Sequence, residues 1–422
     1  MRIALDSPSK RRALWLVLFL LVPIYVVIVT VQFAADWLSN RATLGSLRAA
    51  TKLDPLNAEY RHRLARYYDL VDRNPSAALD HYQAAARLNP HNGQYWLAVA
   101  DAYQTMGDVP RQSDAIGHAV VADPTTPDIA WEAANLYLVE GQNERALHEF
   151  GVVMYGSPNL TLTSLQLCWR ITQDVDLLLR QVVPAHMDAY QDFLNFLMAK
   201  QNTEGTAKVW DAMVRLRQPI EAPRVFNYIR YLLLNKAVGE ADLVWQQAAS
   251  LLGLSAYLPS SSNLIVNASF ELDVLNGGFD WQYGKQQSVS LTLDTAEMHD
   301  GHRSLAIVFD GPGVIDAGIY QVIVVQPNTT YQFSGYYKND EIDGAGGPHF
   351  TLQDLYTANV YYRSDVLREG ASWTGVGGEF TTGPDTHLLV LRVERLPAGS
   401  PIRGKMWIDD FRLSEKAAGG TS

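Results

Sequence analysis

Two short groups of residues in this chain have side chains capable of chemistry, and their spacing decides whether they would perform it. His299 and His302 in "HDGH" are the nearest approach to a metal pair, but they occupy a predicted turn and lack the i, i+4 spacing of a helical site. Asp409 and Asp410 are paired acids, but adjacent residues of a strand point to opposite faces, which a glycosidase pair cannot use. No Gly-rich phosphate loop, Cys/His zinc spacing or nucleophile elbow occurs. We therefore expect no enzyme.

The single cysteine is another candidate for chemistry. Cys168 lies in the apolar run "SLQLCWRI", where a buried packing thiol is expected rather than a reactive one. With one cysteine no internal disulfide can form, so the sequence gives no information about a redox compartment.

Length and charge limit the classes that remain. A chain of 422 residues is too long for one core and indicates two or three domains. Its hydrophobic fraction of 47% with 19% charged residues is ordinary for folded protein. The formal net charge of -11 argues against a nucleic-acid partner, which would need a basic patch.

The first segment has the pattern of a membrane span. Lys10, Arg11 and Arg12 precede a run without charge from Ala13 to Ala35. At ~1.5 Å per residue such a run crosses a hydrocarbon core of about 30 Å. A cleaved signal peptide and a buried core helix are the alternatives. The run is longer than the roughly 7–15 residues of a signal h-region, although "FAAD" offers a small-residue cleavage site.

The positive charges lie before the apolar run. By the positive-inside rule this predicts a cytoplasmic segment at residues 1–12, a single-pass signal anchor at residues 13–37 and an extracytoplasmic remainder. Trp15 and Trp37 lie near the two ends, where interfacial aromatic residues are expected.

A period of about 34 residues follows the span. Pro55, Pro90, Pro124 and Pro158 recur at spacings of 35, 34 and 34 residues. Small, aromatic and glycine residues recur with them: Ala65, Tyr68, Ala78, Tyr82 and Ala85; then Trp96, Ala100, Tyr103, Gly107 and Ala119; then Ala134, Tyr137, Gly141, Ala146 and Phe150. The pattern resembles the tetratricopeptide repeat family, an all-α solenoid of paired helices. The resemblance is carried by residues 50–158, and we assign residues 40–158 to it.

Helical periodicity continues after the repeats. Residues 159–258 contain "HMDAYQDFLNFLMAK", "TAKVWDAMVRLRQ", "PRVFNYIRYLLLN" and "GEADLVWQQAASLLG", each with apolar residues at helical spacing. We expect degenerate helical hairpins that extend the solenoid. Its concave face would suit a protein partner, although the solenoid could equally be a spacer or an assembly element.

The pattern changes after "AYLPSSSN". "SVSLTLD", "SLAIVFD", "IYQVIVV", "TYQFSGYY", "HLLVLRVERL" and "KMWIDDFRL" are strand-length runs separated by turn residues. They predict an all-β sandwich at residues 263–415 and a disordered tail at residues 416–422. In one run Tyr331, Phe333 and Tyr337 share one face of a strand, and Tyr336 lies on the other.

The β-region resembles the jelly-roll carbohydrate-binding modules attached to bacterial glycosidases and, more broadly, the galactose-binding-like sandwich. The resemblance rests on "NLIVNASFE", "GGFDWQ", "HDGHRSLAIVF", "QPNTTYQFSGYYK" and "WIDDFRL". The matching positions are Asn267, Phe270, Glu271, Trp281, Gly301, Ser304, Leu305, Pro327, Tyr331, Ser334, Asp409 and Asp410. The order of these motifs is more specific for the fold than for sugar binding.

The resemblance implies a structural Ca²⁺ between the opening and closing strands. Glu271 and Asp410 are the residues whose carboxylates would ligate it, since a hard cation prefers oxygen. The alternative is that these acids cap strand ends in water.

The resemblance also implies a sugar site with aromatic faces for stacking and polar groups for the hydroxyls. We expect it on the middle strands, at Tyr336, Gln353, Tyr356, Arg392 and Glu394. Trp281, Trp373 and Trp407 are expected in the core or at its rim. A large aromatic residue of a sandwich belongs to the core more often than to a ligand site. The alternative for Tyr336 and Tyr356 is therefore that they too are core residues.

The whole arrangement is similar to the tetratricopeptide proteins that accompany bacterial exopolysaccharide or O-antigen assembly and export. It implies a protein held at the inner membrane with its bulk in the periplasm, recruiting a protein partner through the repeats and holding polysaccharide or oligosaccharide through the sandwich. A purely structural assembly protein whose sandwich binds protein is the alternative. A glycan-acting enzyme is the third.

Overall fold

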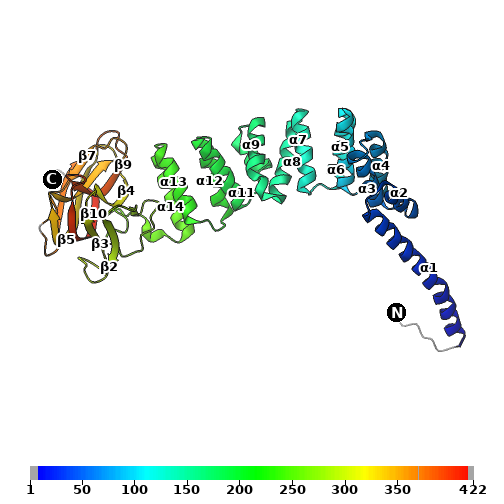
Figure 1. The fold of residues 1–422 in the computed structure, drawn as a ribbon. Helices are drawn as coiled ribbons and strands as arrows, with labels where there is room; N and C mark the ends of the chain where they lie inside the picture. The colour runs from blue at the N-terminus through cyan, green and yellow to red at the C-terminus, as the bar shows by residue number, and fades with distance from the viewer. Residues whose placement is uncertain (1–7, 369, 417–422) are drawn as a thin grey trace. The chain divides into compact units, whose positions relative to one another are not determined.

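The computed structural model describes residues 8–368 and 370–416. Residues 1–7 of the expected cytoplasmic segment and residues 417–422 of the expected tail lie outside them. The chain divides into two compact units, Met1–Phe196 and Leu197–Ser422, and each is described by itself. Fourteen α-helices among the described residues precede an antiparallel β-sandwich of two sheets, which confirms the predicted fold class (Figure 1).

The first unit begins with α1, Pro8–Asn40. Its part Trp15–Asn40 contains an 18-residue window with a mean hydropathy of 2.7, and none of that window is buried by other parts of the chain. Among the described residues it is the one helix long and apolar enough to cross a membrane. A membrane anchor and a signal sequence share this length and composition.

Paired helices follow in the same unit (Figure 1). Helix α3 packs on α4, α5 on α6, and α7 on α8. Asparagine or aspartate side chains cap α3 to α6. Gly107 directly follows α5 with φ of 74°, and Gly141 is the second residue after α7 with φ of 75°. The bounds are α2 Leu44–Leu53, α3 Ala58–Leu70, α4 Pro75–Leu88, α5 Gly93–Met106, α6 Val109–Ala122, α7 Pro127–Val139, α8 Asn143–Gly156, α9 Thr161–Ile171, α10 Val175–Gln181 and α11 Met187–Ala199.

The periodic residues have the positions that their spacing predicts. Ala65, Ala100 and Ala134 are buried where helices meet, because a methyl group permits close approach. Pro90, Pro124 and Pro158 each follow the end of a helix. The helix pairs are therefore present, and membership of the tetratricopeptide family stays a prediction.

Cys168 is fully buried in α9, as its apolar surroundings predict. Burial raises the pKa of its thiol to about 12, so the thiolate that reactive chemistry needs is disfavoured.

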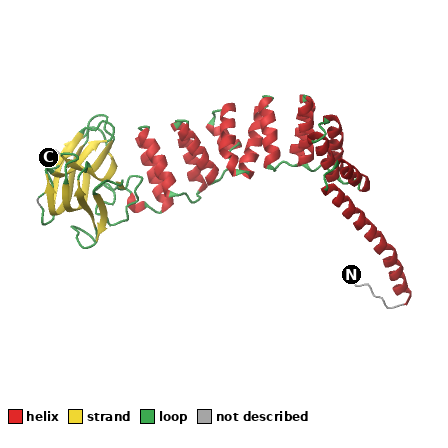
Figure 2. Cartoon of the chain, in the orientation of Figure 1, coloured by secondary structure: helices red, strands yellow, loops and turns green. Residues whose placement is uncertain are grey.

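The second unit combines three helices with the sandwich (Figure 2). Its helices are α12 Thr203–Leu216, α13 Ala222–Leu234 and α14 Val238–Leu252. The sheets have the strand orders β1-β4-β9-β6-β7 and β2-β3-β10-β5-β8. The strands are β1 Gln282–Tyr283, β2 Val289–Asp294, β3 Ser304–Gly311, β4 Asp316–Val324, β5 Thr330–Gly344, β6 Gly347–Asp354, β7 Val360–Arg363, β8 Thr374–Thr381, β9 Leu388–Leu396 and β10 Ile402–Glu415.

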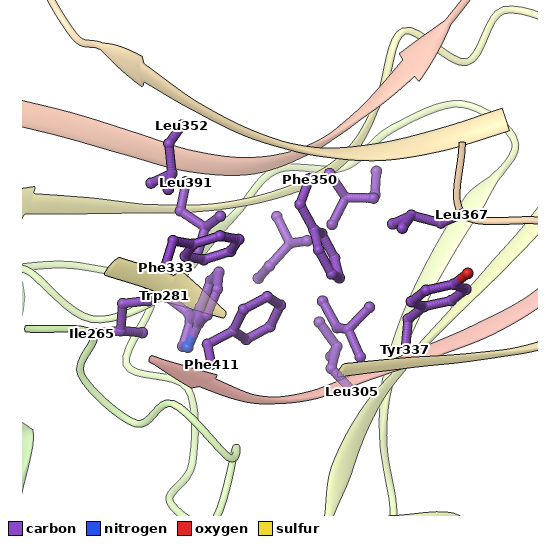
Figure 3. Close-up of a cluster of buried hydrophobic side chains, with 14 of the residues drawn as sticks. Ile265, Trp281, Leu305, Phe333, Tyr337, Phe350, Leu352, Leu367, Leu391 and Phe411 are labelled. Carbon is purple, nitrogen blue, oxygen red and sulfur yellow. The ribbon is translucent and has the colours of Figure 1, made fainter. Parts of the chain in front are cut away.

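An apolar core joins the two sheets (Figure 3). The ring of Phe411 lies 5.0 Å from that of Phe350, 5.5 Å from that of Trp281 and 6.2 Å from that of Phe333, measured between centroids. Tyr331, Phe333 and Tyr337 point into this core from β5, as the alternation of that strand predicts, and Trp281 is a core residue.

Helices α13 and α14 pack directly on the sandwich. A side-chain Cβ at Gly277 would overlap the ring of Phe226 on α13, and one at Gly278 would overlap the ring of Trp245 on α14. The Trp245 ring also meets Phe279 edge to face at 6.4 Å. Two adjacent glycines are thus what allows the helices to approach the sheet.

Candidate functional site

One face of the first sheet carries a group of polar side chains. Along β4, β9 and β6 the side chains alternate, so that residues such as Ile319, Leu391 and Leu352 enter the core and their neighbours point outward. The outward set includes apolar Val322 and Val390. We call its other members the polar face: Asp316, Tyr320, Thr351, Gln353, Arg363, Arg392 and Glu394.

Strand register brings these side chains into rows. Tyr320 on β4 lies opposite Arg392 on β9, which lies opposite Thr351 on β6. A ring, a guanidinium group and a hydroxyl group therefore stand in one row, in which Thr351 is fully buried and Tyr320 is 36% exposed.

Charges on the polar face are partly paired. Glu394 Oε2 accepts hydrogen bonds from Thr351 Oγ1 and from the Arg363 guanidinium, both at 3.1 Å. Arg392 is 4.0 Å from Asp316, and its buried Nε has no hydrogen-bond partner within the part of the chain that the structure describes. A buried unsatisfied donor is costly. The Arg392 side chain as a whole is 30% exposed, so part of it is accessible to a ligand.

A hollow of about 340 Å³ lies over this arginine. Asp316, Tyr320, Val390 and Arg392 form its floor, and Gln286 lies at its wall. Tyr320 is 36% exposed, and its hydroxyl donates to Gln282 Oε1 at 3.1 Å. The hydroxyl is thus fixed while part of the ring stays open to a ligand.

The expected metal ligands lie elsewhere, around the turn at residues 299–303. Glu271 Oε1 accepts backbone N–H bonds from His302 at 2.7 Å and Arg303 at 2.9 Å, and the Arg303 guanidinium donates to the carbonyl of Glu271. These donors lower the pKa of the Glu271 carboxyl group.

Asp410 contributes an oxygen near the same turn, with Oδ2 3.4 Å from Nδ1 of His299. Among the described residues no group of three or more His, Cys, Asp or Glu is arranged to hold a metal ion. Hydrogen-bond donors surround Glu271, so the Ca²⁺ site stays a prediction.

Asp409 and Asp410 do not point to opposite faces in the simple way that alternation predicts. Asp409 is fully buried and its Oδ2 accepts the backbone N–H groups of His299 and Asp300, at 2.8 and 3.1 Å, so both acids reach the same residue, His299. The reason is a β-bulge in β10, where Asp410 takes φ of 47°. Burial raises the pKa of Asp409 to about 6, and its carboxylate holds the turn in place.

Comparison with known proteins supports a binding role for the sandwich. Residues 262–399 match a family described as "Carbohydrate binding domain". The C-terminal part of the chain is a carbohydrate-binding-module-like domain. The match is to a binding domain and concerns this part of the chain alone. No curated protein matches the chain.

Solved structures similar to this chain include carbohydrate-binding modules. One titled "CBM4 structure and function" is 16% identical and covers 36% of this chain and 99% of its own, with a TM-score of 0.29. The CBM22-1 xylan-binding domain of Paenibacillus barcinonensis Xyn10C is 19% identical and covers 36% and 94%, with a TM-score of 0.25. A structure titled "Crystal structure of MamA protein" is 14% identical and covers 44% and 90%, with a TM-score of 0.27.

Three of the five residues expected to bind sugar lie together in the carbohydrate-binding-module-like domain. Gln353 on β6 and Arg392 and Glu394 on β9 all belong to the polar face. The strands β6 and β9 are neighbours in the first sheet, and for this reason the three side chains lie close together.

Tyr336 does not join them. It lies on β5 in the other sheet, and the ring of His299 stacks on it at 3.6 Å with an interplanar angle of 16°. Trp373 meets the same histidine edge to face at 5.7 Å. One face of the Tyr336 ring is therefore covered by the protein itself.

Tyr356 was expected on a middle strand and lies instead in the turn after β6. Asp354 Oδ1 accepts the N–H groups of Tyr356 and Thr357, both at 2.7 Å, and this turn ends the strand. The Tyr356 hydroxyl donates to the carbonyl of Leu233 on α13 at 2.7 Å. The residue therefore joins the helices to the sandwich beside the polar face.

Four residues of the polar face were not predicted from the sequence: Tyr320, Thr351, Asp316 and Arg363. Tyr320 lies in "IYQVIVV", where its position between Ile319 and Gln321 marks it as a candidate for an outward face. Thr351 and Arg363 are found only from the strand pairing, because β6 and β7 have weak strand patterns, and Asp316 only from its register opposite Glu394.

Proposed function

We propose that this protein is a membrane-anchored extracytoplasmic scaffold that binds glycan on the polar face of its C-terminal domain. The observation that carries the proposal is the match of residues 262–399 to a carbohydrate-binding family. The polar face supplies the chemistry that such a role needs, since it combines an open tyrosine ring with charged and amide groups.

Each polar-face residue has a role in this proposal. Tyr320 stacks against one face of a pyranose ring, whose C–H groups are attracted to the aromatic π-face. Arg392 donates to sugar oxygens, and Gln353 and Glu394 bond further hydroxyl groups. The pairing of Glu394 with Arg363 and Thr351 holds that carboxylate in position before the ligand arrives.

The membrane part of the proposal rests on the first helix. Residues 13–37 form a signal anchor in the inner membrane, with residues 1–12 in the cytoplasm and the bulk of the chain in the periplasm. The charge of Lys10, Arg11 and Arg12 before the apolar stretch supports this direction. A reporter active only outside the cytoplasm, fused after Ser422, should be active, and the protein should pellet with membranes. A cytoplasmic C-terminus would contradict the whole scheme.

The helical part recruits a protein partner in this proposal. Its support is the resemblance of the 34-residue period to tetratricopeptide repeats and the observed pairing of helices. We further propose a role in bacterial exopolysaccharide or cell-surface polysaccharide assembly or export, and its support is resemblance of architecture alone.

Glycan binding is tested with the full chain in detergent on a broad glycan array, followed by calorimetry on each hit. We expect a dissociation constant of roughly 10 μM to 1 mM, equivalent to about 4–7 kcal/mol. Arg392→Ala should weaken binding at least tenfold. Arg403→Ala, whose exposed side chain lies on the other sheet, is the matched control and should not. An array without hits, on protein shown to be folded, would favour a structural assembly role.

A further inference from the structure

A second hollow, of about 520 Å³, adjoins the polar face within the same unit. Helix α13 forms one wall with Phe226, Arg230 and Leu233. Tyr320, Val322 and Tyr356 form the other wall. A domain consisting of the sandwich alone would lack the helical wall.

Contacts on both sides of the hollow hold the two walls together. The Phe226 ring occupies the space above Gly277, and the Tyr356 hydroxyl bonds the Leu233 carbonyl at 2.7 Å. The ammonium group of Lys236 lies 5.4 Å from the centre of the Tyr356 ring. Helix and sheet therefore form one preformed surface, which reduces the cost of ordering a site on binding.

The hollow shares lining residues with the one over Arg392. Tyr320 and Leu355 line both, so a ligand lying on the Tyr320 ring extends into each. A chain of a few sugar units has the length to occupy two adjoining hollows of this size.

The charges along this groove favour an anion. Arg230 lines one hollow and Arg392 the other, and among the described residues that line the two hollows Asp316 is the one acid. The Arg230 guanidinium is exposed and bonds the neutral amide oxygen of Asn227 at 2.9 Å, so its charge is not neutralised by that contact. A local excess of positive charge contrasts with a net charge of -11 for the whole chain.

We infer that the two hollows form one composite groove that binds an acidic oligosaccharide, with Arg230 of α13 binding a sugar carboxylate. This inference rests on the proposed glycan-binding function and deepens it by naming the ligand class and a residue outside the sandwich. A guanidinium group pairs with a carboxylate through two parallel hydrogen bonds, which a neutral hydroxyl group cannot reproduce. Tyr320, which lines both hollows, holds the sugar within reach of the two arginines.

The test measures binding of the full chain in detergent to a panel of oligosaccharides that carry uronate, sialate or pyruvyl carboxylates. Each is paired with its carboxyl-reduced or otherwise neutral counterpart. We expect at least one acidic member to bind ten times or more tightly than its neutral counterpart, with the difference shrinking at high salt.

Variants then assign the carboxylate contact. Arg230→Gln should lower affinity for the acidic oligosaccharide about tenfold and leave that for the neutral one unchanged, and Arg230→Lys should restore part of the loss. Arg224→Gln is the matched control on the same helix, because Arg224 pairs with Glu221 at 2.8 Å and does not line the groove.

The outcomes separate this inference from the function on which it rests. Binding of neutral glycans alone, or acidic binding that Arg230→Gln does not change, overturns the composite groove and leaves glycan binding intact. Binding of no member by folded protein overturns both.

Discussion

The ring of Phe226 occupies the space where a side chain at residue 277 would stand, and Gly277 is what permits helix α13 to lie against the sandwich. Gly278 has the same relationship with Trp245 and in addition takes φ of 62°, a conformation that is strained for other residues. The segment "NGGFDW" is thus where the helices pack against the sandwich.

Substituting either glycine should therefore destabilise the second unit. Gly278→Ala adds an overlap with Trp245 and a left-handed backbone strain, and we expect a loss of about 2–4 kcal/mol in the free energy of unfolding. Chemical denaturation followed by tryptophan fluorescence measures it. Gly239→Ala on α14 is the control: a methyl group there meets nothing within 4 Å, so stability should be unchanged or slightly higher. Equal effects of the two changes would contradict the packing.

The stability of the sandwich should fall as the pH rises from about 4 to 7. Asp280 is fully buried, its Oδ2 accepts the N–H of Leu275 at 2.7 Å, and burial raises the pKa of its carboxyl group from 3.8 to about 6. The folded state binds the proton more tightly, so the stabilisation is complete below pH 3.8 and is lost as the pH passes about 6.

Asp280→Asn should remove about 2 kcal/mol of this pH-dependent difference, measured by denaturation across that range. Asp409 has a raised pKa as well, so the slope should decrease rather than vanish. Asp310→Asn, at an exposed site, should leave the profile unchanged. If stability instead rose between pH 4 and 7 and Asp280→Asn removed that rise, the prediction would be wrong.

Replacing Tyr320 and replacing Tyr336 should have opposite effects on glycan affinity and on stability. Tyr320→Ala should weaken glycan binding about tenfold or more and leave the melting temperature nearly unchanged, because the ring is partly open on the polar face. Tyr336→Ala should leave affinity unchanged and cost about 1 kcal/mol of stability, because it removes the stack with His299. The reverse pattern, measured by calorimetry and thermal unfolding, would move the glycan site to the other sheet.

A calcium response would test the ligands expected from the sequence. If Glu271 and Asp410 share a Ca²⁺ ion, a chelator should lower the melting temperature of the protein and added calcium should restore it, since a ligand bound to the folded state stabilises it. Glu271→Ala will lose its bonds to the turn at residues 302–303 in any case, so the informative readout is its missing response to chelator. Asp385→Ala keeps the response. Folded protein that ignores chelator would leave Glu271 with a hydrogen-bonding role alone.

Local pattern was sufficient for much of the architecture. The alternation of Tyr331, Phe333 and Tyr337 predicts which side of β5 is buried, because side chains of a strand have a strict period of two. The 34-residue period predicts helix pairs that meet at small residues, since a recurring alanine places the same close contact in each pair. The apolar stretch of α1 is long enough by composition alone to cross a membrane.

The site depended on contacts that a local pattern does not contain. Tyr336 and Arg392 both lie on strands, but strand order puts them in different sheets, and order is set by long-range pairing. The bulge at Asp410 depends on the extra residue in β10 opposite β5, which shifts the alternation of both acids. Arg230 lies in the same hollow as Tyr320 because Gly277 and Gly278, far along the chain, let the helices pack against the sandwich. Packing between such distant segments is decided by the tertiary structure alone.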